Sequence, residues 1–223
     1  GLDFLFLDRS GDTPAAQVAT SLVGEFTDPA MLAELARRSG VISFDWENIS
    51  VPALRKATRG SAVRVSPPLR ALAAAQDRLS EKRLFDRLRI PTTHYAAVNS
   101  RAALHRALRD IGLPGVLKTR RMGYDGKGQA VIRTAADADA AWQAMGAVPL
   151  LYEGFIPFDY EVSCIAVRGR EGQLAFYPLS RNVHHAGILR VTAAPWHDVA
   201  LERAARRHLR ALLTALDYVG VLL

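Results

Sequence analysis

The sequence predicts an α/β protein, with a parallel sheet near its start and short strands around one helix in its second half. Two observations predict this class. Apolar runs of strand length alternate with helical patterns up to about residue 66, as in βαβ units. From residue 116 the pattern changes to closely spaced short apolar runs, and a glycine-rich segment separates the first two of them.

The first third of the chain has the order of a βαβ-type unit. Leu2–Leu7 is a near-continuous apolar run, which indicates a buried parallel strand. Asp28 and Pro29 are typical of a helix start, as N-cap and first helical residue. The elements expected after this helix are a strand over 41–44, a short helix around Leu54 and a strand over 62–65. This alternation predicts a parallel sheet.

The rest of the chain is predicted to contain long helices and short strands. The helices are expected over 69–88, 101–111, 135–145 and 198–216. The strands are expected over 116–121, 129–133, 149–153, 160–168, 173–179 and 218–223. Pro91 ends the first of these helices, and Asn99 or Ser100 caps the second. The chain begins in a strand without a methionine and ends within a strand, so we expect a piece of a longer polypeptide.

Composition narrows the function classes. Hydrophobic residues make up 49% of the chain and charged residues 23%, as in soluble globular proteins. The sequence has neither an apolar run of 18 residues nor a secretory signal, and its single cysteine, Cys164, fits a reducing cytoplasm. The net charge of +7 is carried by arginines spread along the helices, so we expect a solvated basic surface. We therefore predict a cytoplasmic protein that binds neither nucleic acid nor membrane, and an anionic small-molecule substrate is compatible with its charge.

The segment from Lys118 to Gln129 is the strongest functional signal. It reads as strand, glycine-rich loop, strand, and successive backbone N–H groups in such a loop form a concave anion site. Only four of the 29 Lys and Arg residues are lysines, and Lys118 and Lys127 stand in this window. The order of residues fits neither a Walker A loop nor the dinucleotide fingerprint. The pattern predicts a phosphate-binding hairpin loop, and the alternative is a glycine-rich turn with solvated charges.

Three other segments are weaker candidates. Glu153 ends one expected strand and Glu161 begins the next, so they could bind an adenosine through backbone groups and a carboxylate, or form a plain hinge. His184 and His185 are expected in a loop before Gly187, where adjacent side chains point apart, which argues against a zinc site. Asp45–Asn48 follows a strand at its carboxyl end, where α/β sheets bind ligands. The alternative interpretation of this segment is a helix cap.

Taken together, these segments resemble the ATP-grasp superfamily and, within it, the N5-carboxyaminoimidazole ribonucleotide synthetases of purine biosynthesis. The matching stretches are Gln76–Arg78, Glu81–Lys82, Leu117–Arg121, Gly123–Gln129, Tyr152–Phe158, Glu161–Ser163, Tyr177–Pro178, Asn182 with His184, and Gly187–Arg190. The Gly-Tyr-Asp-Gly-Lys-Gly block is the most specific of them. Asp45–Asn48 resembles an acidic stretch of the family's first domain, although Trp46 departs from the commoner phenylalanine.

The resemblance implies an ATP-grasp fold with an N-terminal Rossmann-like, pre-ATP-grasp domain over 1–66. The ATP-grasp domain would cover 67–223, with a lid subdomain over about 113–180, and both ends of the fold would be incomplete. Further implied are ATP and Mg²⁺ as cofactors, aminoimidazole ribonucleotide and bicarbonate as substrates, and a homodimer. The metal-binding acids would follow Leu223, so no metal ligand is expected within the chain.

The resemblance also implies roles for single residues. ATP would contact residues on both sides of the loop, in the hinge and beyond it: Arg78, Lys118, Gly123, Tyr124, Asp125, Gly126, Lys127, Gly128, Gln129, Glu153, Gly154, Phe155, Ile156, Glu161 and His184. Within this set the two lysines would bind phosphates, Glu153–Ile156 the adenine and Glu161 the ribose. Catalytic roles would fall to Tyr124, Lys127 and Arg190, with Tyr124 on the carboxyphosphate side.

The implied reaction forms carboxyphosphate from ATP and bicarbonate and then carboxylates the amino group of aminoimidazole ribonucleotide. Two alternatives stay open. One is another ATP-grasp ligase, such as a formate-dependent transformylase or a biotin carboxylase, and the other is a non-catalytic ATP-binding protein.

Overall fold

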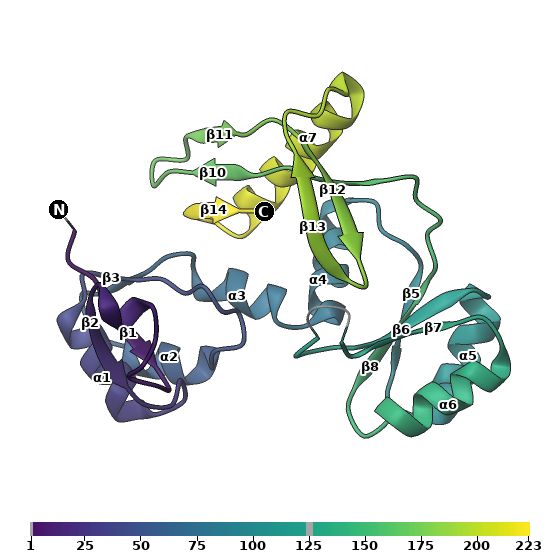
Figure 1. Ribbon diagram of the computed structural model, residues 1–223, viewed down its shortest axis with the longest axis horizontal. Helices are drawn as coiled ribbons and strands as arrows, with labels where there is room; N and C mark the ends of the chain where they lie inside the picture. Colours follow the sequence, from purple (N-terminus) through teal and green to yellow (C-terminus); the bar gives the residue numbers. More distant parts are fainter. Residues whose placement is uncertain (1, 124–126) are drawn as a thin grey trace.

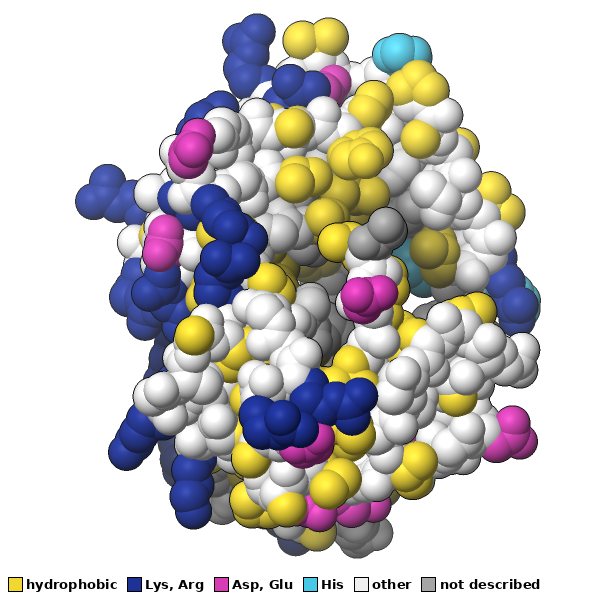
Figure 2. Space-filling model, turned by 90° about the vertical axis from the view of Figure 1, so that its left-hand side faces the viewer, with side chains coloured by type: hydrophobic (Ala, Val, Ile, Leu, Met, Phe, Trp, Pro, Cys, Tyr) yellow, Lys and Arg dark blue, Asp and Glu magenta, His cyan; other side chains and the backbone are white. Residues whose placement is uncertain are grey.

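The computed structural model describes residues 2–123 and 127–223 of the chain. A small N-terminal module, shown in purple and dark blue, is joined through α3 to a larger part that contains the remaining sheets (Figure 1). Along the described residues, no helix combines the length and apolar character that crossing a bilayer requires. Lys and Arg side chains gather along one edge of the face shown in Figure 2, where they are exposed at the surface.

The N-terminal module contains two pairs of parallel strands. Its strands are β1 (Leu5–Asp8), β2 (Thr20–Val23), β3 (Val41–Ile42) and β4 (Arg64–Val65), which pair as β1–β2 and β3–β4. Its helices are the 3₁₀ turn η1 (Ala15–Gln17), α1 (Pro29–Arg38) and α2 (Val51–Ala57). A small core of Leu32, Ala36, Ile42 and Leu54 holds the helices against β3. The predicted parallel pairing is confirmed, although β2 was not expected.

The start of α1 was predicted correctly, and the burial of the first strand was not. Asp28 caps α1 as predicted, because its carboxylate accepts a hydrogen bond from the amide of Ala30 at 2.8 Å. The expectation of a fully buried first strand is wrong. Phe4 and Phe6 keep 60% and 36% of their surface exposed, so the apolar run is not buried along its whole length.

The helix predicted over 69–88 is in fact two helices. α3 (Leu69–Ala75) and α4 (Arg78–Leu88) are separated at Gln76 and Asp77. Asp77 adopts an extended conformation and caps α4 by accepting from the amide of Leu79 at 2.9 Å. The single-helix prediction was wrong because Asp77 is the N-cap of a new helix. Hydrophobic periodicity alone does not reveal a break between two consecutive helices.

A four-stranded antiparallel sheet forms the centre of the larger part. Its strands run in the order β5 (Tyr95–Val98), β8 (Leu150–Gly154), β6 (Gly115–Thr119) and β7 (Gln129–Ile132). The helices α5 (Arg101–Ile111) and α6 (Ala135–Met145) cover one face of it (Figure 1). Between them lies the largest apolar core, which includes Val98, Leu104, Leu117, Ile132, Leu150 and Tyr152. The hairpin β6–β7 and both helices were predicted, whereas β5 was not.

Two three-stranded sheets complete the fold. One has the order β13 (Ile188–Ala193), β12 (Ser180–His185), β9 (Glu161–Ser163), and the other β11 (Leu174–Phe176), β10 (Ala166–Arg168), β14 (Gly220–Leu222). The helix α7 (Val199–Ala215) packs on the second, where Leu209 and Leu213 meet Ala166. The strand predicted over 160–168 is therefore two strands in different sheets.

The segment around His184 was also misread. It was expected to be a loop, but it forms β12, which pairs with both β13 and β9. The register shifts between Val183 and His184, where a bulge interrupts the ladder. Polar side chains on an exposed strand remove the apolar alternation by which a strand is recognised in a sequence.

Candidate nucleotide-binding site

The central sheet separates apolar from charged side chains. Along β6, Leu117 is fully buried against α5 and α6, and Lys118 lies on the opposite face because neighbouring side chains alternate. Along β8, Tyr152 and Glu153 divide in the same way, with Tyr152 directly across from Leu117. The sheet therefore presents Lys118 and Glu153 together on the face that α5 and α6 leave uncovered.

Two lysines share the Glu153 carboxylate. Lys118 Nζ donates to Glu153 Oε1, and Lys82 Nζ from α4 lies 3.0 Å from Glu153 Oε2. Lys82 also donates to Thr92 Oγ1 at 2.6 Å. The three charged side chains are mostly buried, with 9% of the Glu153, 14% of the Lys82 and 21% of the Lys118 side chain exposed. The cluster thus has one anion between two cations from different elements.

The two carboxylates near the lysines have opposite pKa shifts. Burial favours a raised pKa for Glu153, but hydrogen bonds and charge attraction from Lys118 and Lys82 outweigh it, so the pKa lies below the usual value. Glu81, one residue before Lys82, has a raised pKa because burial outweighs the attraction of Arg78 and the lysines. The lysines therefore stabilise Glu153 as an anion, while Glu81 holds its proton more tightly than an exposed glutamate.

The base of the glycine-rich loop is closed by backbone and side-chain contacts. The Thr119 amide donates to the carbonyl of Gly128 at 2.7 Å. Gly128 has φ of +69°, and a Cβ at this position would lie 2.6 Å from Thr119 Oγ1, so a larger residue would be strained here. Tyr124, Asp125 and Gly126 lie outside the described residues.

A paired charge ties the start of this loop to α4. Arg120 makes two hydrogen bonds to the Asp77 carboxylate, 3.0 Å from Nε and 2.5 Å from Nη2. The Arg78 amide donates to the Arg120 carbonyl at 3.0 Å. Desolvation would raise the pKa of Asp77, but Arg120 and the amides at the helix start lower it overall. The α3–α4 break and the loop are therefore held together at one point.

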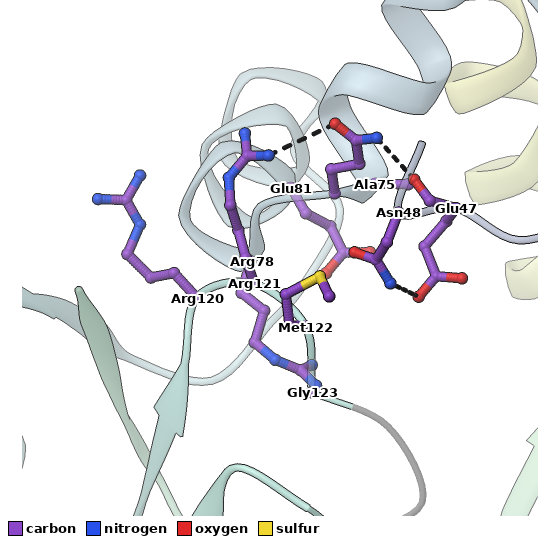
Figure 3. Close-up of a pocket in the computed structure, with 10 residues that line it drawn as sticks. Glu47, Asn48, Ala75, Arg78, Glu81, Arg120, Arg121, Met122 and Gly123 are labelled. Atoms are coloured by element: carbon purple, nitrogen blue, oxygen red, sulfur yellow. Dashed lines mark hydrogen bonds between the residues drawn. The ribbon is translucent and has the colours of Figure 1, made fainter. Parts of the chain in front are cut away.

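A polar pocket of about 190 Å³ lies beside this junction. Its lining comes from three parts of the chain: Glu47 and Asn48 of the N-terminal module, Ala75, Gln76, Arg78 and Glu81 of α3 and α4, and Arg120–Gly123 after β6. Figure 3 shows Glu47 and Asn48 facing the segment from Arg121 to Gly123 across the start of α4. Gln76 donates to the carbonyls of Glu47 and Ile49, each at 2.6 Å, and so ties the module to the α3–α4 junction.

In the hinge after β8, two backbone amides are already hydrogen-bonded to other parts of the chain. The Gly154 amide donates to the His94 carbonyl at 3.0 Å, and the Phe155 amide donates to the Pro114 carbonyl at 3.1 Å. The side chains of Phe155 and Ile156 are 42% and 53% exposed. The hinge therefore offers apolar side chains to solvent while two of its amides stabilise the sheet.

The remaining predicted residues divide into a pair and single positions. Glu161 on β9 and His184 on β12 contact each other, with 2.7 Å between Oε2 and Nδ1. Gln129 begins β7 directly across from Lys118, and Lys127 precedes it. Arg190 lies on β13, where every residue is exposed. Within residues 2–123 and 127–223, His, Cys, Asp and Glu side chains form no group of three that could bind a metal ion.

Lys82, Gln76 and Asp77 had no predicted role, although they lie in stretches that resemble the family. All three make contacts with residues more than nine positions away: Lys82 with Glu153, Gln76 with Glu47, and Asp77 with Arg120. The scarcity of lysine was the available signal for Lys82, because lysine is the rare basic residue of this chain.

Two protein-family models match the sequence of this chain. The model of the ATP-grasp domain matches residues 83–223, and the model of the ribonucleotide synthetase preATP-grasp domain matches residues 1–76. The chain therefore belongs to the ATP-grasp family, and the predicted fold class is confirmed. The predicted domain bounds of 1–66 and 67–223 stay predictions.

Individual relatives share one description. The N5-carboxyaminoimidazole ribonucleotide synthase of Pseudomonas aeruginosa is 43% identical over 222 residues, which are 100% of this chain and 61% of the relative. The crystal structure of N5-carboxyaminoimidazole ribonucleotide synthetase from Thermus thermophilus superposes with a TM-score of 0.91 at 43% identity, over 99% of this chain and 59% of that one. N5-carboxyaminoimidazole synthetase from Staphylococcus aureus complexed with ADP gives a TM-score of 0.93 at 26% identity, over 98% and 58%. The chain thus spans about three fifths of the length of these relatives.

Proposed function

We propose that this chain is the nucleotide-binding part of an ATP-dependent ligase that carboxylates 5-aminoimidazole ribonucleotide in purine biosynthesis. The observation that carries the proposal is the position of Lys118. Its ammonium group lies on the uncovered face of the sheet, beside a glycine-rich loop, in a chain 43% identical throughout to a synthase of this activity. A mostly buried lysine next to backbone amides is suited to binding phosphate oxygens.

Nucleotide contacts are proposed for residues on several elements around the uncovered face of the sheet. Lys118, Lys127 and Arg78 would face the phosphates, and the loop from Gly123 to Gln129 would cover them. The backbone of the hinge Glu153–Ile156 would hold the adenine beside the exposed side chains of Phe155 and Ile156, while the lysines bind the Glu153 carboxylate. Glu161, oriented by its contact with His184, would accept from the ribose hydroxyls.

The proposed reaction has two steps. A bicarbonate oxygen attacks the γ-phosphorus of ATP, the bond to the β-phosphate oxygen breaks, and ADP and carboxyphosphate form. The amino nitrogen of the ribonucleotide then attacks the carboxyl carbon, inorganic phosphate leaves, and the amine loses a proton. The protein contributes positioning and neutralisation of the phosphate charge, and loop closure would protect carboxyphosphate from water.

The polar pocket at the α3–α4 junction is the proposed side for the ribonucleotide. It adjoins the loop through Arg121, Met122 and Gly123, and it carries both carboxylates and guanidinium groups. Such a lining suits an anionic substrate with hydroxyl and amino groups. We propose Tyr124 and Arg190 as further catalytic residues, in line with the family resemblance.

According to the family resemblance, the acidic residues that bind magnesium would follow Leu223. Among the described residues, no group of three His, Cys, Asp or Glu side chains could bind the ion by itself. The cofactor Mg²⁺ stays a prediction, as do the homodimer and the cytoplasmic location.

The first test removes the lysine on which the proposal depends. Lys118→Ala in the full-length protein should weaken ATP and ADP binding about 100-fold, because a charge-assisted contact to phosphate is lost. Isothermal titration calorimetry measures this change, and Lys56→Ala, an exposed lysine on α2, is the matched control. Unchanged nucleotide affinity in Lys118→Ala would show that the phosphates bind elsewhere.

The second test addresses the substrate. ADP release by the full-length protein should require bicarbonate and 5-aminoimidazole ribonucleotide together. Release driven by another acceptor would assign a different ATP-grasp ligase, and nucleotide binding without any release would assign a non-catalytic protein.

A further inference from the structure

The Glu153 carboxylate has more cations than it needs for neutrality. Lys118 approaches one oxygen from β6, and Lys82 approaches the other at 3.0 Å from α4. Only one of these lysines stands next to the glycine-rich loop, because Lys118 precedes Thr119, whose amide closes the loop base. Lys82 is instead fixed by a second bond, to Thr92 Oγ1 at 2.6 Å.

This difference decides what happens when a phosphate arrives. If Lys118 turns to a phosphate oxygen, it leaves a carboxylate of which only 9% of the side chain is exposed. An uncompensated charge at such a site is unfavourable, and the group would neutralise itself by taking a proton. A second cation that stays in place removes that penalty.

We propose that Lys82 is a positioning residue for nucleotide binding, which holds the Glu153 carboxylate in place and ionised so that Lys118 can leave it for a phosphate. The inference rests on the proposed function, because it assumes that Lys118 binds the nucleotide. It assigns to Lys82 no contact with the nucleotide itself.

The charges around Glu153 define what else could take over this role. Lys118 comes from β6, while α4 contributes Lys82, Glu81 and Arg78. Glu81 and Glu153 repel each other, Arg78 attracts Glu81, and the two lysines attract both carboxylates. From β5, Tyr95 lies directly across from Glu153 in the sheet, and its hydroxyl is bound to Asp86. Among these groups only the two lysines contact the Glu153 carboxylate.

The decisive variant is Lys82→Met in the full-length protein, with ADP as the probe. Its affinity at neutral pH should fall about 10- to 30-fold, because releasing Lys118 now leaves Glu153 unpaired. Binding should also take up close to one proton, whereas the wild type takes up none at Glu153. Calorimetry in buffers of different ionisation enthalpy measures this proton, and the affinity of Lys82→Met should rise as the pH is lowered.

A double variant separates positioning from direct contact. In Lys82→Met/Glu153→Gln the buried charge is gone, so ADP affinity should recover towards the wild-type value and the proton uptake should disappear. Lys56→Met serves as the control for loss of a lysine. Lys82→Gln, which retains a donor for Thr92, replaces Lys82→Met if thermal unfolding shows that the methionine variant does not fold.

The outcomes are distinguishable. A weaker Lys82→Met without proton uptake, and without recovery in the double variant, would mean that Lys82 contacts the nucleotide and would overturn the inference. Wild-type affinity in Lys82→Met would overturn it as well, while leaving the proposed function intact. Failure of the wild-type protein to bind ADP would overturn the proposed function, and the inference with it.

Discussion

The two faces of the central sheet are stabilised in different ways. Towards α5 and α6, Leu117, Ile132 and Tyr152 are fully buried in apolar contacts. Towards α4, Glu153 lies between Lys82 and Lys118, beside the buried Leu151, so charge pairs are part of what holds this face. A buried apolar side chain has no alternative ligand to contact. A lysine that binds a carboxylate can bind another anion in its place.

This difference locates function on one face. A phosphate can compete for Lys118 because the carboxylate it would replace offers the same kind of interaction. No ligand competes for the contacts of Ile132, so the apolar face gives the sheet its rigidity. We therefore expect substitutions on the face towards α5 and α6 to lower stability. Substitutions at the lysines should change ligand affinity.

The largest effect is expected from Ile132→Ala. Ile132 is fully buried, and its truncation should cost about 2–5 kcal/mol of unfolding free energy, because a cavity forms in the core. The neighbouring Val131 points to the other face and is 39% exposed, so Val131→Ala should cost less than about 1 kcal/mol. Urea unfolding of both variants measures the difference.

The ADP affinity of Ile132→Ala and Val131→Ala serves as a control. Neither variant should change ADP affinity while the protein is folded, because both side chains lie outside the lysine cluster. Equal destabilisation by Ile132→Ala and Val131→Ala would show that the two faces do not differ in the way described.

A smaller effect is expected at the pair that ties the loop to α4. Asp77→Asn keeps a side-chain oxygen for capping α4 but removes the charge that Arg120 binds through two hydrogen bonds. The unfolding free energy at pH 7 should fall by about 1–2 kcal/mol, less than for a fully buried pair because Arg120 is partly exposed. Asp77→Ala should cost about 1 kcal/mol more, because the cap is lost too.

The pH dependence of this difference has a definite sign. The pKa of Asp77 is lower in the folded protein than its usual value of 3.8, so the ionised form stabilises the fold. The stability difference between wild type and Asp77→Asn should therefore be fully present above pH 4 and vanish as the pH falls through the lower, folded pKa. Unfolding curves from pH 7 to pH 3 test this, and a difference that does not change with pH would contradict the role of the charge.

The sequence predicted the elements whose signals are local. The cap at Asp28, a cap at Asn99 or Ser100 and the hairpin around the glycine-rich loop depend on neighbouring residues. The structure contains all of them, with Ser100 as the second cap. The family resemblance, carried by the glycine-rich block, also led to the right fold class.

What the sequence did not predict depends on residues far apart in the chain. The helix break at Gln76 and Asp77 is stabilised by Arg120 and by the carbonyl of Glu47. Lys82 acquires its position from Glu153, which is 71 residues further on, a separation that no periodicity or motif spacing encodes. Local propensity is a weak guide where such contacts override it.

The smallest effect is expected at Tyr95, which lies on the charged face directly across from Glu153. Its hydroxyl donates to Asp86, and burial together with this carboxylate raises the pKa of Tyr95 to about 12. Tyr95→Phe should lower the unfolding free energy by less than about 1 kcal/mol, because the bond is to an exposed carboxylate. Since the folded pKa exceeds the usual value of 10.0, this stabilisation should be constant below pH 10 and be lost as the pH rises towards 12.

Spectrophotometric titration follows the same group directly. Tyrosinate absorbance of the wild type should include one component near pH 12 that is missing from Tyr95→Phe, and Tyr177→Phe, which removes an exposed tyrosine, should retain it. A component lost equally in both variants would mean that Asp86 does not hold the Tyr95 proton. In that case the charged face would be held by the lysine cluster alone, and the pairing of β5 with β8 would owe nothing to the Tyr95–Asp86 bond.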